Sequence, residues 1–339
     1  MTKNSDPKPD AGKVVLQELT GEEPSSKPQR VRARQTFLIP LLAVVSGLIL
    51  GAILIIVTDL NVYAAFGRSF GEGIVTALRA VGTAYGALLR SAFGDPARII
   101  AALQSGDAMA IRRAFNPFLE SLVVATPYIF AGLAVALGFR AGVFNIGVEG
   151  QLFIGATTAT FVGYSITGLP AIIHVPLALL AGALGGALWG FIPGWLKAKT
   201  GGDEVINTIM MNWIAFRLTD WLLAGPMRRP TSGGMPISPE VQPTALLPRF
   251  FESPIRFHMG FFVALVVAWL VWFLLFKTTW GYNLRTVGAN PQAAKYGGMN
   301  IVLSTIMAMT LSGALAGLAG ANQILGITKS MAMGLSSGY

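Results

Sequence analysis

Seven apolar stretches divide most of this chain, and each is long enough to cross a membrane. About 20 apolar residues in a helix span the ~30 Å hydrocarbon core of a bilayer. The first stretch, Phe37–Val57, has 21 residues and carries no charge. The stretches lie at 37–57, 119–138, 148–166, 172–195, 205–224, 259–276 and 301–325. Because lipid leaves no partner for open backbone groups, the sequence predicts an all-α, polytopic membrane bundle with about seven transmembrane helices.

The composition agrees with lipid as the solvent. Only 12% of the residues are charged, against roughly 25% in soluble domains. The chain has no cysteine, so it offers neither a disulfide framework nor a thiolate site. Its net charge of +9 is dispersed among apolar stretches rather than gathered on a basic surface with aromatic residues between. We therefore expect no nucleic-acid partner.

The first 35 residues differ from the rest of the chain. They are polar and proline-containing, which predicts a disordered tail at 1–35 and one transmembrane domain at 36–339. Lys27, Arg30, Arg32 and Arg34 directly precede the first apolar stretch. The positive-inside rule then places the N-terminus in the cytoplasm. A cleaved signal peptide is the alternative, but the long leader and the long apolar run argue against it.

Alternation from a cytoplasmic N-terminus places 59–117 and 225–257 outside, and 196–204 and 277–300 inside. Several basic residues follow the rule and fall inside: Lys197, Lys199, Lys277, Arg285 and Lys295. Six arginines conflict with it and fall outside: Arg68, Arg79, Arg90, Arg98, Arg112 and Arg113. The rule is weaker for long segments. Apolar residues at helical spacing between Ile74 and Leu89 predict a helix lying along the outer interface.

Glycine spacing indicates how the helices associate. Gly182, Gly186, Gly190 and Gly194 recur every four residues, and Gly313 and Gly317 have the same spacing. Such small residues let two helix backbones approach closely in lipid. We expect packing inside the bundle, with a dimer face as the alternative.

The segment 139–151 interrupts two apolar stretches with glycines and polar side chains. It carries Asn145, Glu149 and Gln151 among Gly142, Gly147 and Gly150. Irregular polar backbone at membrane depth is tolerated where it is buried in protein or lines a wet cavity. Broken helices are a common binding device in transporters. A cavity-lining break is the first interpretation, and an ordinary turn at the cytoplasmic face is the second.

Two further polar groups lie inside apolar stretches. Asn207 and Asn212 follow Asp203 and Glu204, whose acidic groups suit the start of a helix. Asn322 and Gln323 form a second amide pair, for which helix–helix hydrogen bonding is as good an explanation as a ligand. The polar, glycine-punctuated segment 278–302 also separates two apolar stretches, with a short helix expected at about 289–298. Such a segment is expected to contact something in the water.

The sequence contains no motif that supports a catalytic function. Gly334–Gly338 matches G-x-S-x-G, but a nucleophile elbow needs a strand-turn-helix context. The sequence has no Walker A pattern and no cluster of metal ligands. We expect no catalytic residue, no metal and no cofactor.

Three phrases, in order, resemble a known family. They are the segment 85–94, the phrase Phe-Asn-Ile-Gly-Val-Glu-Gly at 144–150, and the polar segment at 284–301. The chain from 37 to 339 resembles permease subunits of bacterial ABC importers of the ribose, branched-chain amino acid and nucleoside class. It is most similar to the nucleoside branch, which works with a lipoprotein of the basic membrane protein type. Residues 101–117 look like extra length relative to the family.

The resemblance implies a multi-pass inner-membrane permease subunit rather than an enzyme. Its expected partners are an ATP-binding subunit, a second related permease subunit and an extracytoplasmic substrate-binding lipoprotein. The implied ATPase-coupling positions in a cytoplasmic coupling helix and its flanks are Arg285, Gly288, Asn290, Ala293, Ala294 and Gly298. The expected translocation path comprises Asn145, Glu149, Gln151, Asn207 and Asn212.

Two expectations remain open. Family members continue past Ser-Ser-Gly-Tyr, so the permease domain is expected to be incomplete at its C-terminus. A nucleoside is the first expectation for the solute, and a simple sugar such as ribose is the second. The remaining alternatives for the function are a secondary transporter and a non-transport assembly protein, and neither would depend on an ATPase subunit.

Overall fold

A computed structural model describes residues 29–253 and 255–335. The chain forms two compact units that meet in sequence between Leu89 and Arg90. The boundary falls within α4 (Phe70–Phe93). The division into a tail at 1–35 and one transmembrane domain at 36–339 stays a prediction.

The described part of the first unit is helical apart from Asp59 and Ser69, which separate its helices. α2 (Gln29–Thr58) contains the first apolar stretch and is followed by α3 (Leu60–Arg68) and then α4. Residues 29–35, expected to belong to a disordered tail, are therefore helical, since arginine and glutamine extend a helix readily. The rest of that predicted tail, 1–28, lies outside the described residues. The Tyr85 hydroxyl donates to the Leu48 carbonyl and so joins α4 to α2.

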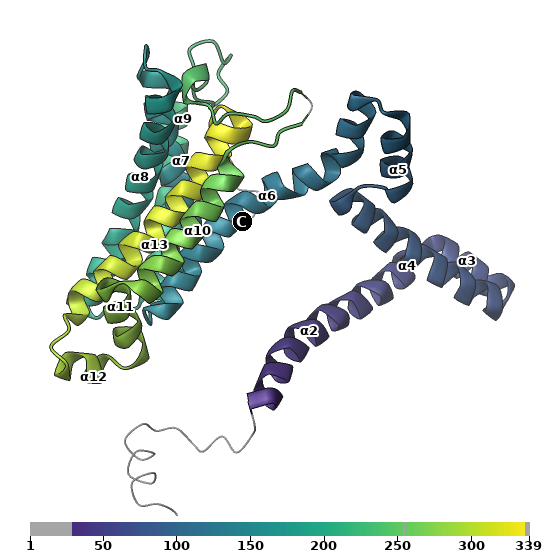
Figure 1. Cartoon of the computed structure of the whole chain (residues 1–339), viewed down its shortest axis with the longest axis horizontal. Coiled ribbons are helices and arrows are strands. Elements are labelled where there is room, and N and C mark those ends of the chain that lie inside the picture. The colour runs from purple at the N-terminus through teal and green to yellow at the C-terminus, as the bar shows by residue number, and fades with distance from the viewer. Residues whose placement is uncertain (1–28, 254, 336–339) are drawn as a thin grey trace, which may run out of the picture. The chain divides into compact units, whose positions relative to one another are not determined.

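The second unit is a helical bundle (Figure 1). Its elements are α5 (Pro96–Ser105), α6 (Ala108–Arg140), α7 (Val148–Ser165), α8 (Ala171–Thr200), α9 (Glu204–Ala224), α10 (Gly260–Lys277), α11 (Thr279–Ala289), α12 (Pro291–Tyr296), α13 (Ile301–Gln323), a 3₁₀ turn at Pro243–Ala245 and a π-helical turn at Ile324–Thr328. Between 29 and 335, apart from 254, the only β pairing is two isolated bridges. The predicted all-α class is confirmed.

Within the part of the chain that the structure describes, five helices are long and apolar enough to cross a membrane. These candidate spans are Leu38–Thr58, Ala108–Arg140, Ala171–Thr200, Gly260–Lys277 and Ile301–Thr328. The other two predicted spans form α7 and α9, which are more polar. α7 packs against α8, α9 and α13, so much of its surface faces protein, where polar groups find partners. The polytopic membrane bundle is therefore confirmed, with α7 as an internal helix.

Glycines hold the bundle together at its centre. A Cβ atom at Gly186 would overlap the Gly313 carbonyl oxygen, and one at Gly313 would overlap the Gly186 oxygen. Gly317 touches α8 in the same way at Gly182, and α7 at Gly155. Helices α7, α8 and α13 thus meet backbone to backbone, as small residues permit. The repeated glycines of α8 and α13 serve packing within this chain, as first expected.

The connections divide between the two ends of the bundle. The turn α8–α9, the break between α6 and α7, and the segment α11–α12 lie at one end (Figure 1). The segment 225–259 lies at the other end, where the Leu247 amide bonds to the Leu325 carbonyl and the Ser238 amide to the Met331 carbonyl. The two segments expected inside, 196–204 and 277–300, thus share one end, and the segment 225–257 expected outside lies at the other.

Candidate translocation and coupling site

The predicted helix break is present between α6 and α7. α6 ends at Arg140 and α7 begins at Val148. Gly142 has a φ of 73°, which only glycine adopts without strain. The chain turns there and leads into α7 through backbone that makes no regular helical bonds. The helix is therefore interrupted at this segment, and the interpretation of the break as the lining of a cavity stays a prediction.

Asn145 and Gln151 hold the break from inside the protein. They are 3% and 1% exposed, respectively. The Asn145 Nδ2 donates to Gln151 Oε1 at 2.8 Å, and the Gln151 Nε2 returns a bond to Asn145 Oδ1 at 3.2 Å. Asn145 Nδ2 also donates to Ser312 Oγ at 2.8 Å, and Ser312 in turn donates to the Ala134 carbonyl at 2.7 Å. This network joins α6, the break, α7 and α13.

Asn212, on α9, holds the same break from the side. Its Oδ1 accepts from the Gly150 amide at 2.9 Å, and its Nδ2 donates to the Ile146 carbonyl at 3.0 Å. The first amides of a helix have no partner within that helix. One side chain from α9 therefore satisfies a free donor of α7 and a carbonyl of the break. Its amide acts across the bundle as a cap does within a helix.

Glu149 and Asn207 complete the predicted path residues. Both are partly exposed at the same end of the bundle, Glu149 in the first turn of α7 and Asn207 in the first turn of α9. Two of the five predicted residues, Asn145 and Gln151, thus form a buried pair. Asn212 is bonded to backbone, and Glu149 and Asn207 lie nearer the surface. Asn145, Gln151 and Asn212 therefore meet at the break, and Glu149 and Asn207 lie at the same end of the bundle.

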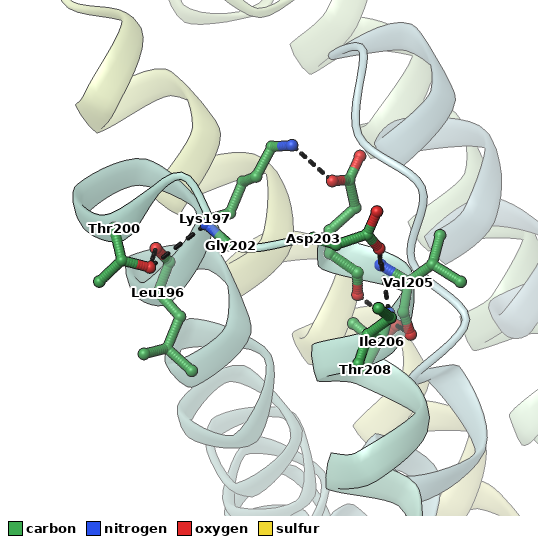
Figure 2. Close-up of polar contacts among 9 residues, drawn as sticks. Leu196, Lys197, Thr200, Gly202, Asp203, Val205, Ile206 and Thr208 are labelled. Carbon is green, nitrogen blue, oxygen red and sulfur yellow. Dashed lines mark hydrogen bonds and ion pairs between the residues drawn. The ribbon is translucent and has the colours of Figure 1, made fainter.

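An ion pair closes the turn between α8 and α9 (Figure 2). Lys197 Nζ lies 2.6 Å from Glu204 Oε2, with side-chain exposures of 35% and 17%. Asp203 caps α9 by accepting from the Val205 and Ile206 amides at 2.9 and 3.1 Å. Helix capping and ion pairing therefore account for both acidic residues: Asp203 caps α9, and Glu204 joins the end of α8 to the start of α9.

The predicted short helix is α12. Asn290 begins it by accepting from the Ala293 amide at 3.0 Å, ahead of Pro291 in the first turn. Ala294 is fully buried, whereas Ala293 is exposed. Gly298 ends the turn with a φ of 77°. One face of α12 is thus anchored and the other is exposed.

Two glycines join α11 to the break. A Cβ atom at Gly142 would lie 2.8 Å from the Gly288 Cα, and one at Gly288 would lie 2.7 Å from the Gly142 amide nitrogen. Two guanidinium groups flank this contact. Arg140 Cζ lies 5.8 Å and Arg285 Cζ 5.1 Å from the centre of the Phe276 ring, within cation–π range. The end of α6, the end of α10 and α11 therefore meet at one point.

Three residues of this site carry little signal in the sequence. Ser312 lies within an apolar helix, and its role follows only from hydrogen bonds to residues that are far from it in the sequence. Phe276 is one aromatic residue among many in α10. Tyr296 is 98% exposed at the end of α12. Its only sequence signal was an aromatic residue in a polar segment that was expected to contact a partner.

Aromatic residues near the break mostly pack within the protein. Phe130 is fully buried, and Phe153 meets Phe216 edge to face with centroids 4.8 Å apart. Phe144 stacks on Phe139 at 5.1 Å. An apolar groove of about 490 Å³ lies further along, among α7, α8 and α9. None of the five predicted path residues lines it.

At one end of this membrane bundle the helix break contacts α11, which leads directly into the half-exposed α12. Comparison with known proteins assigns the family. Residues 118–339 match the family described as the branched-chain amino acid transport system permease component, and the chain belongs to it. Permeases of ABC transporters are integral membrane proteins that work with an ATP-binding subunit and a substrate-binding protein.

Three relatives illustrate the range of the similarity. A guanosine ABC transporter permease protein of Bacillus subtilis is 38% identical over 87% of this chain and 74% of its own length. A nucleoside ABC transporter permease protein of Lactococcus lactis is 29% identical over 84% of this chain and 69% of its own length. A glucose ABC transporter permease protein of Haloferax volcanii is 37% identical over 65% of this chain, which spans only 60% of that relative. No solved structure matches the chain.

Proposed function

We propose that this chain is the permease subunit of an ATP-driven nucleoside importer. The nucleoside assignment rests on the guanosine and nucleoside permeases, which align with most of the chain. The end of the bundle with α11 and α12 faces the cytoplasm, together with the N-terminus. There α12 meets the ATP-binding subunit, a second related permease completes the pathway, and an extracytoplasmic lipoprotein delivers the solute.

The contact of Gly142 with Gly288 carries the mechanistic part of the proposal. Closure of the ATP-binding subunits moves α12 and, with it, α11. Because the Gly288 backbone touches the break directly, that movement reaches the start of α7 without an intervening side chain. A packed interface favours discrete arrangements over gradual deformation. The bundle then alternates between inward- and outward-open states, each stabilised by its own partner contacts.

The solute path follows the polar side chains around the break. Asn145, Glu149, Gln151, Asn207 and Asn212 supply donors and acceptors that suit the hydroxyl and amide groups of a nucleoside. In the described arrangement Asn145 and Gln151 bond to each other. In the open state these amides exchange their mutual bonds for bonds to the solute. Arg285, Gly288, Asn290, Ala293, Ala294 and Gly298 act instead in coupling to the ATPase.

A simple sugar is the second candidate solute, favoured by the glucose permease relative. The two alternatives differ in the ligand that accelerates ATP hydrolysis. The test is the ATPase activity of the whole reconstituted transporter with its binding protein, supplied with guanosine, uridine, ribose or glucose. Acceleration by nucleosides supports the proposal, acceleration by sugars alone replaces the solute, and ATPase activity indifferent to every solute contradicts it.

A further inference from the structure

A second polar feature lies far from the break, between α5 and the first turns of α6. The two helices enclose a cleft of about 370 Å³ within the second unit. Its walls are mainly alanines, with Ser105 near the turn. Arg98 from α5 and Arg113 from α6 add two guanidinium groups to this small-residue lining. The cleft therefore combines apolar walls with two cations.

The two cations are poorly neutralised. Among the described residues Arg113 makes no ion pair, whereas its neighbour Arg112 reaches Glu252 at 3.6 Å. Arg98 comes no closer than 3.8 Å to Asp95, and its side chain is 84% exposed. Asp95 is also occupied as the cap of α5, where it accepts from the Ala97 amide. An exposed pair of this kind contributes little, so the cleft keeps a positive charge.

The length of α6 indicates where the cleft lies relative to the two surfaces of the membrane. Arg113 and Arg140 are 27 positions apart on this helix (140 − 113), which corresponds to ~40 Å at 1.5 Å per residue. A bilayer measures roughly 40–45 Å with its headgroups included. If Arg140 lies at one surface, this length brings Arg113 to the headgroup region of the other. Pro117 and Pro127 lie within α6 and can bend it, so the straight length is an upper bound.

We propose that this cleft binds the phosphodiester headgroup of an anionic glycerophospholipid. A guanidinium group donates two parallel hydrogen bonds to phosphate oxygens, and basic pockets between membrane helices suit anionic headgroups. The alanine walls accept the glycerol and the first methylenes. The site also accounts for arginines on the side where the positive-inside rule disfavours them, because Arg98 and Arg113 face lipid phosphate.

The test measures lipid binding to the full chain in a neutral detergent. Native mass spectrometry gives the Kd for phosphatidylglycerol, with phosphatidylcholine as the zwitterionic control and inorganic phosphate as competitor. The cleft variant carries Arg98→Gln and Arg113→Gln. We expect its Kd for phosphatidylglycerol to rise about tenfold or more, since charge-assisted hydrogen bonds are lost, and its Kd for phosphatidylcholine to stay unchanged.

A matched variant removes the same charge elsewhere. Arg79→Gln with Arg228→Gln changes two exposed arginines that do not line the cleft. Its Kd is expected to stay within about twofold of the parent value. Ala110→Leu fills the cleft while retaining both guanidinium groups, and it is expected to weaken phosphatidylglycerol binding as well. Equal losses in both double variants, no loss on filling the cleft, or displacement of lipid by inorganic phosphate would overturn the assignment.

Discussion

Gly142 and Gly288 touch through their backbones: a Cβ atom on either would lie within 2.8 Å of the other's main chain. Gly142 belongs to the break before α7, and Gly288 lies one turn before α12. A contact between two main chains has little room to yield, because interiors are packed as densely as crystals. A displacement of α11 must therefore move the break or separate it from α11.

Substitution of Gly288 tests this contact. Gly288→Ala places a methyl group against the Gly142 amide nitrogen and the Ala141 carbonyl carbon. Overpacking of this kind costs about 1–3 kcal/mol, so the thermal unfolding midpoint of the purified chain is expected to fall. Gly132→Ala is the control, because no heavy atom lies within 4 Å of its new Cβ. Equal midpoints for the two variants would show that the contact is loose.

The glycine junction of α8 and α13 makes a parallel prediction. Gly186→Ala directs a methyl group into the Gly313 carbonyl and should lower the free energy of unfolding by about 1–3 kcal/mol. Denaturation in mixed detergent measures the change. Gly47→Ala in α2 meets nothing within 4 Å and should change the free energy by less. An unchanged Gly186→Ala protein would argue that these helices are not in backbone contact.

Asn212 is expected to stabilise the break through both ends of its amide. Asn212→Ala leaves the amide of the buried Gly150 without this partner, which costs about 1–3 kcal/mol, and it also removes the more exposed bond to the Ile146 carbonyl. Hydrogen exchange of the Gly150 amide should become faster. Asn207→Ala, one helical turn and more away on α9, is the matched control. Unchanged exchange at Gly150 in the Asn212→Ala protein would contradict the capping role.

His258 gives the chain a pH dependence. Burial, assisted by the positive charge of Arg249, lowers the pKa of His258 from 6.5 to about 4. The folded state therefore favours neutral imidazole, and the unfolded state binds more protons between these two values. Stability should be complete above pH 6.5 and decline as the pH falls toward 4. Unfolding midpoints measured across this range for the parent and His258→Gln test it, and equal slopes would contradict the prediction.

Structural features that depend on residues adjacent in the sequence could be predicted. Glycines around 142–150 marked the break, and Asn290-Pro291 supplies the cap and first turn from which α12 starts. Contacts between distant segments were beyond such reasoning. Gly288 was selected by resemblance, and nothing local shows that its backbone meets Gly142. The amide of Asn212 was identified as polar in an apolar helix, but its bonds to the break depend on how α9 packs beside α7.

The same limit applies to the boundaries of elements. The start of α2 at Gln29 reflects continuation of a helix into residues that composition assigned to a tail. The polarity of α7 reflects its neighbours rather than lipid. Its sequence alone does not show which of its faces meets protein, so the polar break was left between a cavity and a turn.

The most direct measurement is uptake of radiolabelled guanosine by cells carrying the whole gene with its ATP-binding and lipoprotein partners. Uptake is expected to require the ATP-binding subunit. It should be lost in Ala293→Arg, which places a bulky charge on the exposed face of α12, and retained in Ala293→Ser with both proteins equally present in the membrane. Guanosine uptake that persists without the ATP-binding subunit, or in the Ala293→Arg variant, would contradict a permease driven through α12.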